Sequence, residues 1–204
     1  MSRDLDRELG ERLTKGLESM GVRVLLGVEV VSSGGDGSSL RLSNGSEVKA
    51  DITVVAAGVQ PNADLVSGQL PLGPHGAVQV DDLMRAGLDY VFAAGDVAEH
   101  RNAVTGLPDW RPLAPIANKM GLVAGVNAAG GHIRFPGVVG DLVTRVGDVI
   151  YGRVGLNEAE AARAGIRYVV GSSTMRSRAR YYPGGGEVYV KVIAEEPTGR
   201  VIGG

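Results

Sequence analysis

The chain has 204 residues, of which 44% are hydrophobic and 22% are charged, and its formal net charge is -2 at pH 7. These values are typical of one large or two small globular domains with a buried core, and they offer no basic field for nucleic acid. No apolar run is long enough to cross a membrane, and the charged N-terminus does not resemble a signal peptide. We therefore expect a cytoplasmic protein that binds neither membranes nor nucleic acid.

The inventory of reactive side chains excludes several kinds of site. The sequence contains no cysteine, which excludes disulfides, thiolate catalysis and cysteine metal sites within these residues. The histidines His75, His100 and His132 lie too far apart in the sequence to pair on one helix face, so each is expected on the surface or in a loop. The 32 glycines predict many tight turns.

The first fifty residues predict a helix followed by a small antiparallel sheet. Apolar side chains recur every three or four residues over 4–20, which gives one apolar helix stripe that Gly21 ends. Strand character is found at 22–31, 40–43 and 47–50, and Asn44-Gly45 predicts a tight hairpin turn between the last two strands.

Two later apolar runs predict strands that are buried on both faces. The first covers 52–57 and ends at Gly58, and the second covers 90–94 and ends at Gly95-Asp96. Ligands of α/β proteins bind at the carboxyl ends of such strands. The small residues at the first end would let a flat group come close, and the Asp96 carboxylate could accept hydrogen bonds from sugar or ribityl hydroxyls. A rigid turn at the first site and a helix cap at the second are the alternatives.

The remaining sequence predicts a helix and then a separate α+β domain. Residues 112–129 have helix character, with prolines near the start and Gly130-Gly131 at the end. The pattern then changes to short strands and one helix. The strands are expected at 142–146, 149–154, 168–173 and 187–194, and the helix at 157–164.

The order and spacing of these motifs resemble the pyridine nucleotide-disulfide oxidoreductase family. Ala57-Gly58 with Pro61-Asn62 matches the link between the family's two nucleotide-binding domains, and Asp96 matches the Asp that binds the flavin's ribityl chain. Residues 112–121, Pro-Leu-Ala-Pro-Ile-Ala-Asn-Lys-Met-Gly, resemble the helix whose N-terminus points at the flavin ring. A helix N-terminus would favour the negative charge of a reduced flavin. A plain packing helix explains these residues equally well.

A narrower resemblance concerns the last quarter of the chain. Residues 155–161, 178–184 and 198–203 resemble the dimerisation domain that coenzyme A disulfide reductases share with NADH oxidases and persulfide reductases. In coenzyme A-dependent members, tyrosines of this domain reach the partner subunit's active site, so Tyr181 and Tyr182 become substrate candidates. Packing of a loop by two aromatic rings is the alternative. Leu122 and Ala86 depart from the arginine and threonine that many members have.

The resemblance implies an α/β fold, namely a partial flavoprotein with two dinucleotide-binding, Rossmann-like domains followed by an α+β dimerisation domain. Residues 1–80 would be the C-terminal part of the NAD(P)-binding domain, 81–132 the returning segment of the FAD-binding domain, and 133–204 part of the dimerisation domain. The implied cofactors are FAD and either NADH or NADPH, in a homodimer that acts on a small thiol, disulfide or oxygen. The cofactor-binding residues carried over are Gly95, Asp96, Leu113, Ala114, Ala117, Ala57 and Gly58.

Two requirements of the family are not met within the sequence. It contains neither of the two Gly-x-Gly-x-x-Gly phosphate loops nor the redox cysteine, so it supplies no catalytic residue. We therefore expect part of an FAD-dependent NAD(P)H reductase that is inactive alone. A non-catalytic dimerising module and a ferredoxin- or rubredoxin-reductase-like flavoprotein are the alternatives. Because strands of the other half would flank 52–57 and 90–94, we expect these faces to be exposed and the chain to associate or dissolve poorly.

Overall fold

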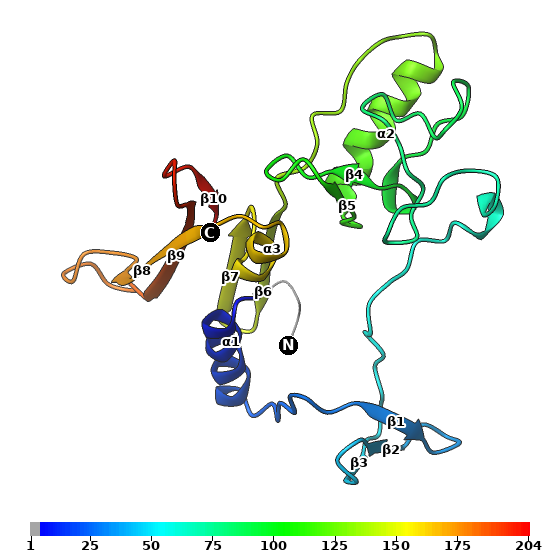
Figure 1. Ribbon diagram of the computed structural model, residues 1–204. Helices are drawn as coiled ribbons and strands as arrows, with labels where there is room; N and C mark the ends of the chain where they lie inside the picture. The colour runs from blue at the N-terminus through cyan, green and yellow to red at the C-terminus, as the bar shows by residue number, and fades with distance from the viewer. Residues whose placement is uncertain (1–4) are drawn as a thin grey trace. The chain divides into compact units, whose positions relative to one another are not determined.

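The computed structural model describes residues 5–204, which form two compact units. The first unit runs to Val59 and also contains Arg145–Tyr151, and the second contains Gln60–Thr144 and Gly152–Gly204. Figure 1 traces the chain through both. In the described residues, the strands pair antiparallel in the sheets of residues 30–49, 100–109 and 168–203.

The predicted first helix is confirmed as α1 (Arg7–Ser19). The predicted start at Asp4 lies outside the described residues. The leucines of the apolar stripe are half-buried, and Gly21 follows the helix with a φ of 85°, a value that favours glycine. Gly16 of α1 lies directly against the side chain of Val149, so the helix surface has no space for a larger residue at this point.

The small antiparallel sheet is also confirmed, with strand order β1 (Val30–Ser33), β2 (Ser39–Leu42), β3 (Glu47–Lys49). In its hairpin turn, the Asn44 side chain accepts a hydrogen bond from the Ser46 amide at 3.0 Å, and Gly45 has a φ of 82°. The first strand was predicted at 22–31, which is wrong for all but its last two residues. The only neighbour of β1 is β2, and no strand of the described residues pairs with 22–29.

The prediction of a buried strand at 52–57 is wrong. This segment has no regular structure, and Ile52, Val54 and Val55 are 81%, 83% and 83% exposed. A strand becomes buried on both faces only when other strands and covering layers lie beside it. None of the strands in residues 5–204 pairs with this run, which confirms the expectation that its apolar face is exposed.

The second unit has its main core around α2 (Ala114–Ala128), which confirms the helix predicted at 112–129. Figure 1 shows α2 in green, with β4 (His100–Arg101) and β5 (Pro108–Asp109) beside it. The buried side chains of this core come from α2 and from the segments before and after it. They are Met84, Ala98, Ile116, Met120, Val123, Phe135 and Val138.

The second predicted buried strand, at 90–94, is also wrong. It forms only a single antiparallel bridge, between Arg85 and Phe92, and Tyr90 is 79% exposed. The end of the run differs from its beginning, because Ala93 and Ala94 pack against the core around α2. Two isolated parallel bridges join Val78 to Ala98 and Asn102 to Val138, but no parallel sheet forms in the described residues.

The predicted α+β region contains the expected elements. A two-stranded sheet, β6 (Asp141–Val146) with β7 (Val149–Val154), precedes α3 (Glu158–Arg163). A three-stranded antiparallel sheet follows, in the order β10 (Val201–Gly203), β9 (Glu187–Glu195), β8 (Tyr168–Arg176). Strands β4, β5 and β10 and the short 3-10 helices Asp64–Val66 and Gly95–Val97 had not been predicted.

The described structure is therefore a mixture of helices and antiparallel strands. No helix between residues 5 and 204 is long and apolar enough to cross a membrane.

Candidate functional site

The Asp96 turn is the first part of the candidate site. It is a single 3-10 turn, Gly95–Val97, closed by a hydrogen bond from the Ala98 amide to the Gly95 carbonyl at 3.0 Å. Gly95 has a φ of 80°, which explains why glycine stands there. The Asp96 side chain is exposed, and within residues 5–204 no donor reaches its carboxylate. Its oxygens are therefore open to hydroxyl donors from a ligand.

The start of α2 is the second part. Leu113 is the N-cap residue, with extended backbone angles of φ -129° and ψ 132°. Its amide donates to the Arg111 carbonyl at 2.9 Å, and its carbonyl accepts from Ile116 and Ala117, each at 3.0 Å. Pro115 has no amide hydrogen. Ala114 is exposed, and its amide has no acceptor within the described residues. This N–H of the first helical turn is therefore available to a ligand.

These two parts touch. A side chain at Gly95 would lie 3.6 Å from the Cβ atom of Ala117, so the turn packs on the first turn and a half of α2. Small residues at both positions bring the Asp96 turn and the helix start together. Five of the seven predicted cofactor residues therefore lie on two adjoining elements of one unit. They are Gly95, Asp96, Leu113, Ala114 and Ala117.

The other predicted residues lie elsewhere. Ala57 and Gly58 belong to the exposed run of the first unit, and Gly58 has a φ of 99°. Tyr181 and Tyr182 lie in the loop between β8 and β9 and are 89% and 59% exposed. The guanidinium of Arg178 lies 5.7 Å from the centre of the Tyr182 ring. Neither tyrosine packs the loop as a buried residue.

Sequence reasoning missed the segment that joins the two parts, residues 109–111. The indole Nε1 of Trp110 donates to the main-chain carbonyl of Asp96 at 2.8 Å. The Asp109 carboxylate accepts from the Trp110 amide at 2.9 Å and from Nε of Arg111 at 2.8 Å. The only sequence signal was the position of the single tryptophan, between the Gly-Asp motif and the helix.

Arg111 belongs to a chain of charges that is largely shielded from solvent. Its guanidinium reaches Glu160 of α3 at 3.1 Å, and both side chains are 16% exposed. Glu160 also pairs with the buried Arg153 and accepts the Asn157 amide at 3.0 Å, which completes a capping box at the start of α3. Burial alone would raise the pKa of Asp109, but the hydrogen bond and charge of Arg111 outweigh it and hold that pKa below its ordinary value.

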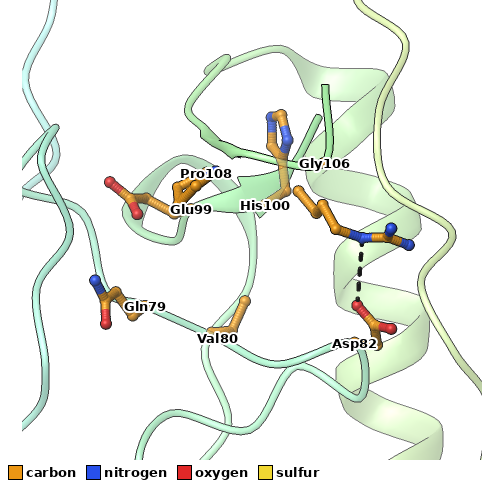
Figure 2. A pocket seen from close by; sticks show the side chains of 8 residues that line it. Gln79, Val80, Asp82, Glu99, His100, Gly106 and Pro108 are labelled. Atoms are coloured by element: carbon orange, nitrogen blue, oxygen red, sulfur yellow. Dashed lines mark ion pairs between the residues drawn. The ribbon is translucent and has the colours of Figure 1, made fainter. Parts of the chain in front are cut away.

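A cavity of about 300 Å³ is lined in part by residues of β4 and β5. Figure 2 shows its walls, and the dashed line marks the ion pair from Nε of Arg101 to Asp82 at 3.8 Å. None of the predicted cofactor residues lines it. The lining residues are Gln79, Val80, Asp82, Glu99, His100, Arg101, Gly106 and Pro108.

His100 corrects the prediction that all three histidines lie on the surface or in loops. It is only 4% exposed and stands in β4 opposite Asp109 of β5. Burial lowers the pKa of His100, although the charge of Asp109 opposes this effect. His75 and His132 are exposed, as predicted.

Comparison with protein families gives two matches that together cover most of the chain. The pyridine nucleotide-disulphide oxidoreductase family model matches residues 1–121, and the dimerisation-domain model of that family matches residues 144–204. Among curated relatives, an NAD(P)H coenzyme A polysulfide/persulfide reductase of Pyrococcus horikoshii is 35% identical over 100% of this chain and 46% of its own length. An NADH oxidase of Methanocaldococcus jannaschii is 32% identical over 100% of this chain and 45% of its own.

Solved structures give the same assignment. A NAD-dependent persulfide reductase from A. fulgidus superposes with a TM-score of 0.92 at 36% identity, over 98% of this chain and 37% of its own. The reduced CoADR-RHD protein of Bacillus anthracis gives a TM-score of 0.93 at 28% identity, over 100% of this chain and 37% of its own. The chain spans less than half the length of these relatives. It belongs to the pyridine nucleotide-disulphide oxidoreductase family, in the branch of coenzyme A disulfide reductases, NADH oxidases and persulfide reductases.

Proposed function

We propose that these residues are part of an FAD-dependent oxidoreductase that takes electrons from NADH or NADPH and passes them to a disulfide, a persulfide or oxygen. The observation that carries this proposal is the contact between the Asp96 turn and the start of α2. It brings an exposed carboxylate and a helix amide, neither of which has a partner within residues 5–204, onto adjoining elements. The names of the relatives, which include NAD(P)H-dependent reductases and NADH oxidases, support the choice of reaction.

Each predicted residue has a defined task in this proposal. Asp96 accepts hydrogen bonds from the ribityl hydroxyls of FAD. The Ala114 amide and the partial positive charge of the helix end face the flavin ring and stabilise negative charge that develops there on reduction. Leu113 holds the helix start through its carbonyl, and Gly95 and Ala117 leave space for the cofactor. The flavin, when bound, supplies the electron transfer itself.

The assignments of Ala57, Gly58 and the three domain ranges are supported by the family matches and not by a specific contact. Ala57 and Gly58 would line the nicotinamide side, in a segment 1–80 that we assign to the NAD(P)-binding domain. Residues 81–132 would be the returning part of the FAD-binding domain and 133–204 part of the dimerisation domain. The two family matches, to 1–121 and to 144–204, favour a division of this kind.

Tyr181 and Tyr182 are the proposed contacts to the acceptor in a partner subunit. Their exposure and the position of Arg178 beside the Tyr182 ring support this role, because an exposed aromatic pair next to a cation suits a large polar substrate. A coenzyme A thiol or disulfide is one such substrate, and it is the group named for the Pyrococcus horikoshii relative.

A homodimer is the proposed assembly. The register of β8 and β9 places Val169 and Met175 on the same face as Val188, Val190 and Val192, and all are between 37% and 52% exposed. An apolar sheet face of this kind suits an interface with a second copy. It also favours the alternative of a dimerising module without catalysis, which predicts a stable dimer that holds no flavin.

The test is flavin retention after Asp96→Asn, a change that keeps the shape of the side chain but removes its charge. It is made in the gene product that carries these residues together with any sequence flanking them. Because hydrogen bonds to a charged group contribute about 1.5–3 kcal/mol, we expect the dissociation constant of FAD to rise about tenfold or more. Visible absorbance of the purified protein measures it.

Asp64→Asn is the matched control, since Asp64 is another exposed aspartate in a 3-10 turn of the same unit. It should leave the flavin content unchanged. Equal flavin content in the Asp96 variant and the wild type would contradict the assigned role, and a wild-type protein that dimerises without flavin would favour the module.

A further inference from the structure

Both elements of the proposed flavin site are attached to one short segment, residues 109–111. Trp110 reaches the Asp96 turn through the 2.8 Å hydrogen bond from its indole to the Asp96 carbonyl. Arg111 reaches the helix start through its own carbonyl, which accepts the Leu113 amide at 2.9 Å. The two elements are thus tied to Trp110 and Arg111, neighbouring residues that directly follow β5.

This segment is itself fixed by Asp109. The Asp109 carboxylate accepts from the Asn102 amide group at 2.9 Å, from the Trp110 amide at 2.9 Å and from Arg111 at 2.8 Å. Asp109 also stands opposite His100 in the pairing of β4 with β5. A carboxylate held by three donors and only 19% exposed has one favoured orientation.

The opposite end of Arg111 is fixed by a residue far away in the sequence. Glu160, 49 positions later, accepts from the Arg111 guanidinium while it also caps α3 and pairs with Arg153. Gly140 lies against the same guanidinium, and a Cβ atom there would come within 2.7 Å of it. Arg111 therefore occupies a closely fitted place between the helix start and α3.

We infer that Trp110 and Arg111 are positioning residues of the flavin site. Trp110 sets the main chain of the residue whose carboxylate holds the ribityl chain. Arg111 sets the entry into α2 and connects it, through Glu160, to the part of the chain that matches the dimerisation domain. A displacement of α3 is thereby transmitted to the helix end that faces the flavin. This inference rests on the proposed function of Asp96 and α2.

The first test is Trp110→Phe, which keeps an aromatic ring and removes the donor to Asp96. Loss of one neutral hydrogen bond contributes about 1 kcal/mol, so we expect the dissociation constant of FAD to rise about fivefold. Tyr90→Phe is the control, because it removes a hydroxyl from an exposed aromatic residue that has no role in the inference. It should leave FAD affinity as in the wild type.

The second test separates positioning from simple stability. Arg111→Lys and Glu160→Gln are made singly and together, and the reduction potential of the bound flavin is measured alongside the FAD dissociation constant. If Arg111 orients the helix end, each single variant makes the potential more negative, since the reduced flavin loses part of its stabilisation. The double variant should shift it by less than the sum of the two. Arg163→Lys, on α3 but outside this network, should shift nothing.

A third readout is tryptophan fluorescence. Trp110 is the single tryptophan of these 204 residues, and the emission that is lost in Trp110→Phe belongs to Trp110, whichever tryptophans the flanking sequence contributes. Bound flavin should quench it strongly, because the indole is bonded to the residue proposed to hold the ribityl chain.

Four outcomes decide between the claims. Loss of flavin with Asp96→Asn together with the expected effects at Trp110 and Arg111 supports both. Loss of flavin with Asp96→Asn but wild-type affinity and potential in the Trp110 and Arg111 variants overturns the inference and leaves the proposed function intact. Unquenched Trp110 fluorescence, measured as the difference from Trp110→Phe, in a flavin-loaded protein also overturns the inference. A wild-type protein that takes up no flavin overturns the proposed function first, and the inference with it.

Discussion

The two apolar runs, 52–57 and 90–94, have nearly the same sequence pattern and very different surroundings. Val54 and Val55 of the first are each 83% exposed. Ala93 and Ala94 of the second pack against the core that surrounds α2. The pattern predicts that a segment has apolar faces to bury, but the partner that buries them comes from elsewhere in the chain. The second run has such partners within these residues, since Val91 also packs against a small buried cluster, and only Tyr90 at its start is left largely exposed.

The largest expected difference between the two runs is in the free energy of unfolding when one side chain in each region is shortened to alanine. Met120→Ala removes a side chain that is 1% exposed in the core beside the second run, and we expect it to lower the free energy of unfolding by about 2–5 kcal/mol. Val54→Ala, in the first run, should change it by less than about 0.5 kcal/mol. Urea unfolding, followed for the second unit in the Met120 variant and for the first unit in the Val54 variant, measures the two losses. Equal losses would show that the first run is packed after all.

A smaller effect is expected from the glycines that end the two runs. Gly95→Ala puts a side chain where φ is 80°, in a turn held against α2, and should lower the free energy of unfolding by about 1–2 kcal/mol. Gly58→Ala has a comparable φ of 99° but no neighbour within 4 Å, so its backbone can relax at little cost. Thermal melts of the two variants compare them, and an effect at Gly58 as large as at Gly95 would count against the distinction.

The smallest effect concerns pH and belongs to the second unit alone. Because burial lowers the pKa of His100 in the folded state, the unfolded chain takes up the proton more readily, and stability should fall as pH drops below about 6.5, the ordinary value for histidine. The groups around it are Asp109, Arg111 and His75, and the pKa of Asp109, also lowered, adds a further loss only in more acidic solution. His100→Phe should flatten the profile between pH 7 and 5. Denaturant unfolding at several pH values measures this, and an unchanged slope would falsify the assignment.

Elements with local signals were predictable from the sequence. The Asn44-Gly45 hairpin, α2 with its prolines at the start, and α3 with its capping box each depend on residues a few positions apart. The strand predictions for 22–29, 52–57 and 90–94 were wrong because strand formation depends on distant partners that no local pattern identifies. Strands β4 and β5 contain two residues each, too few for any periodicity.

The same distinction applies to the candidate site. Asp96 and Ala114 could be named in advance because each lies in a short motif. Trp110 and Arg111 could not, because their importance comes from contacts across 14 and 49 positions, with Asp96 and Glu160. Their roles became visible only when the folded chain brought these residues together.

The Glu160 side chain has two roles, one that depends on its length and one that depends on its charge. The cap of α3 needs an acceptor that reaches back to the Asn157 amide, and the ion pairs need a full negative charge between Arg111 and Arg153. Glutamine keeps the reach and loses the charge, whereas aspartate keeps the charge and is one carbon too short. Of these three side chains only glutamate meets both requirements, whereas the neighbouring Ala159, exposed on the same helix, is under neither.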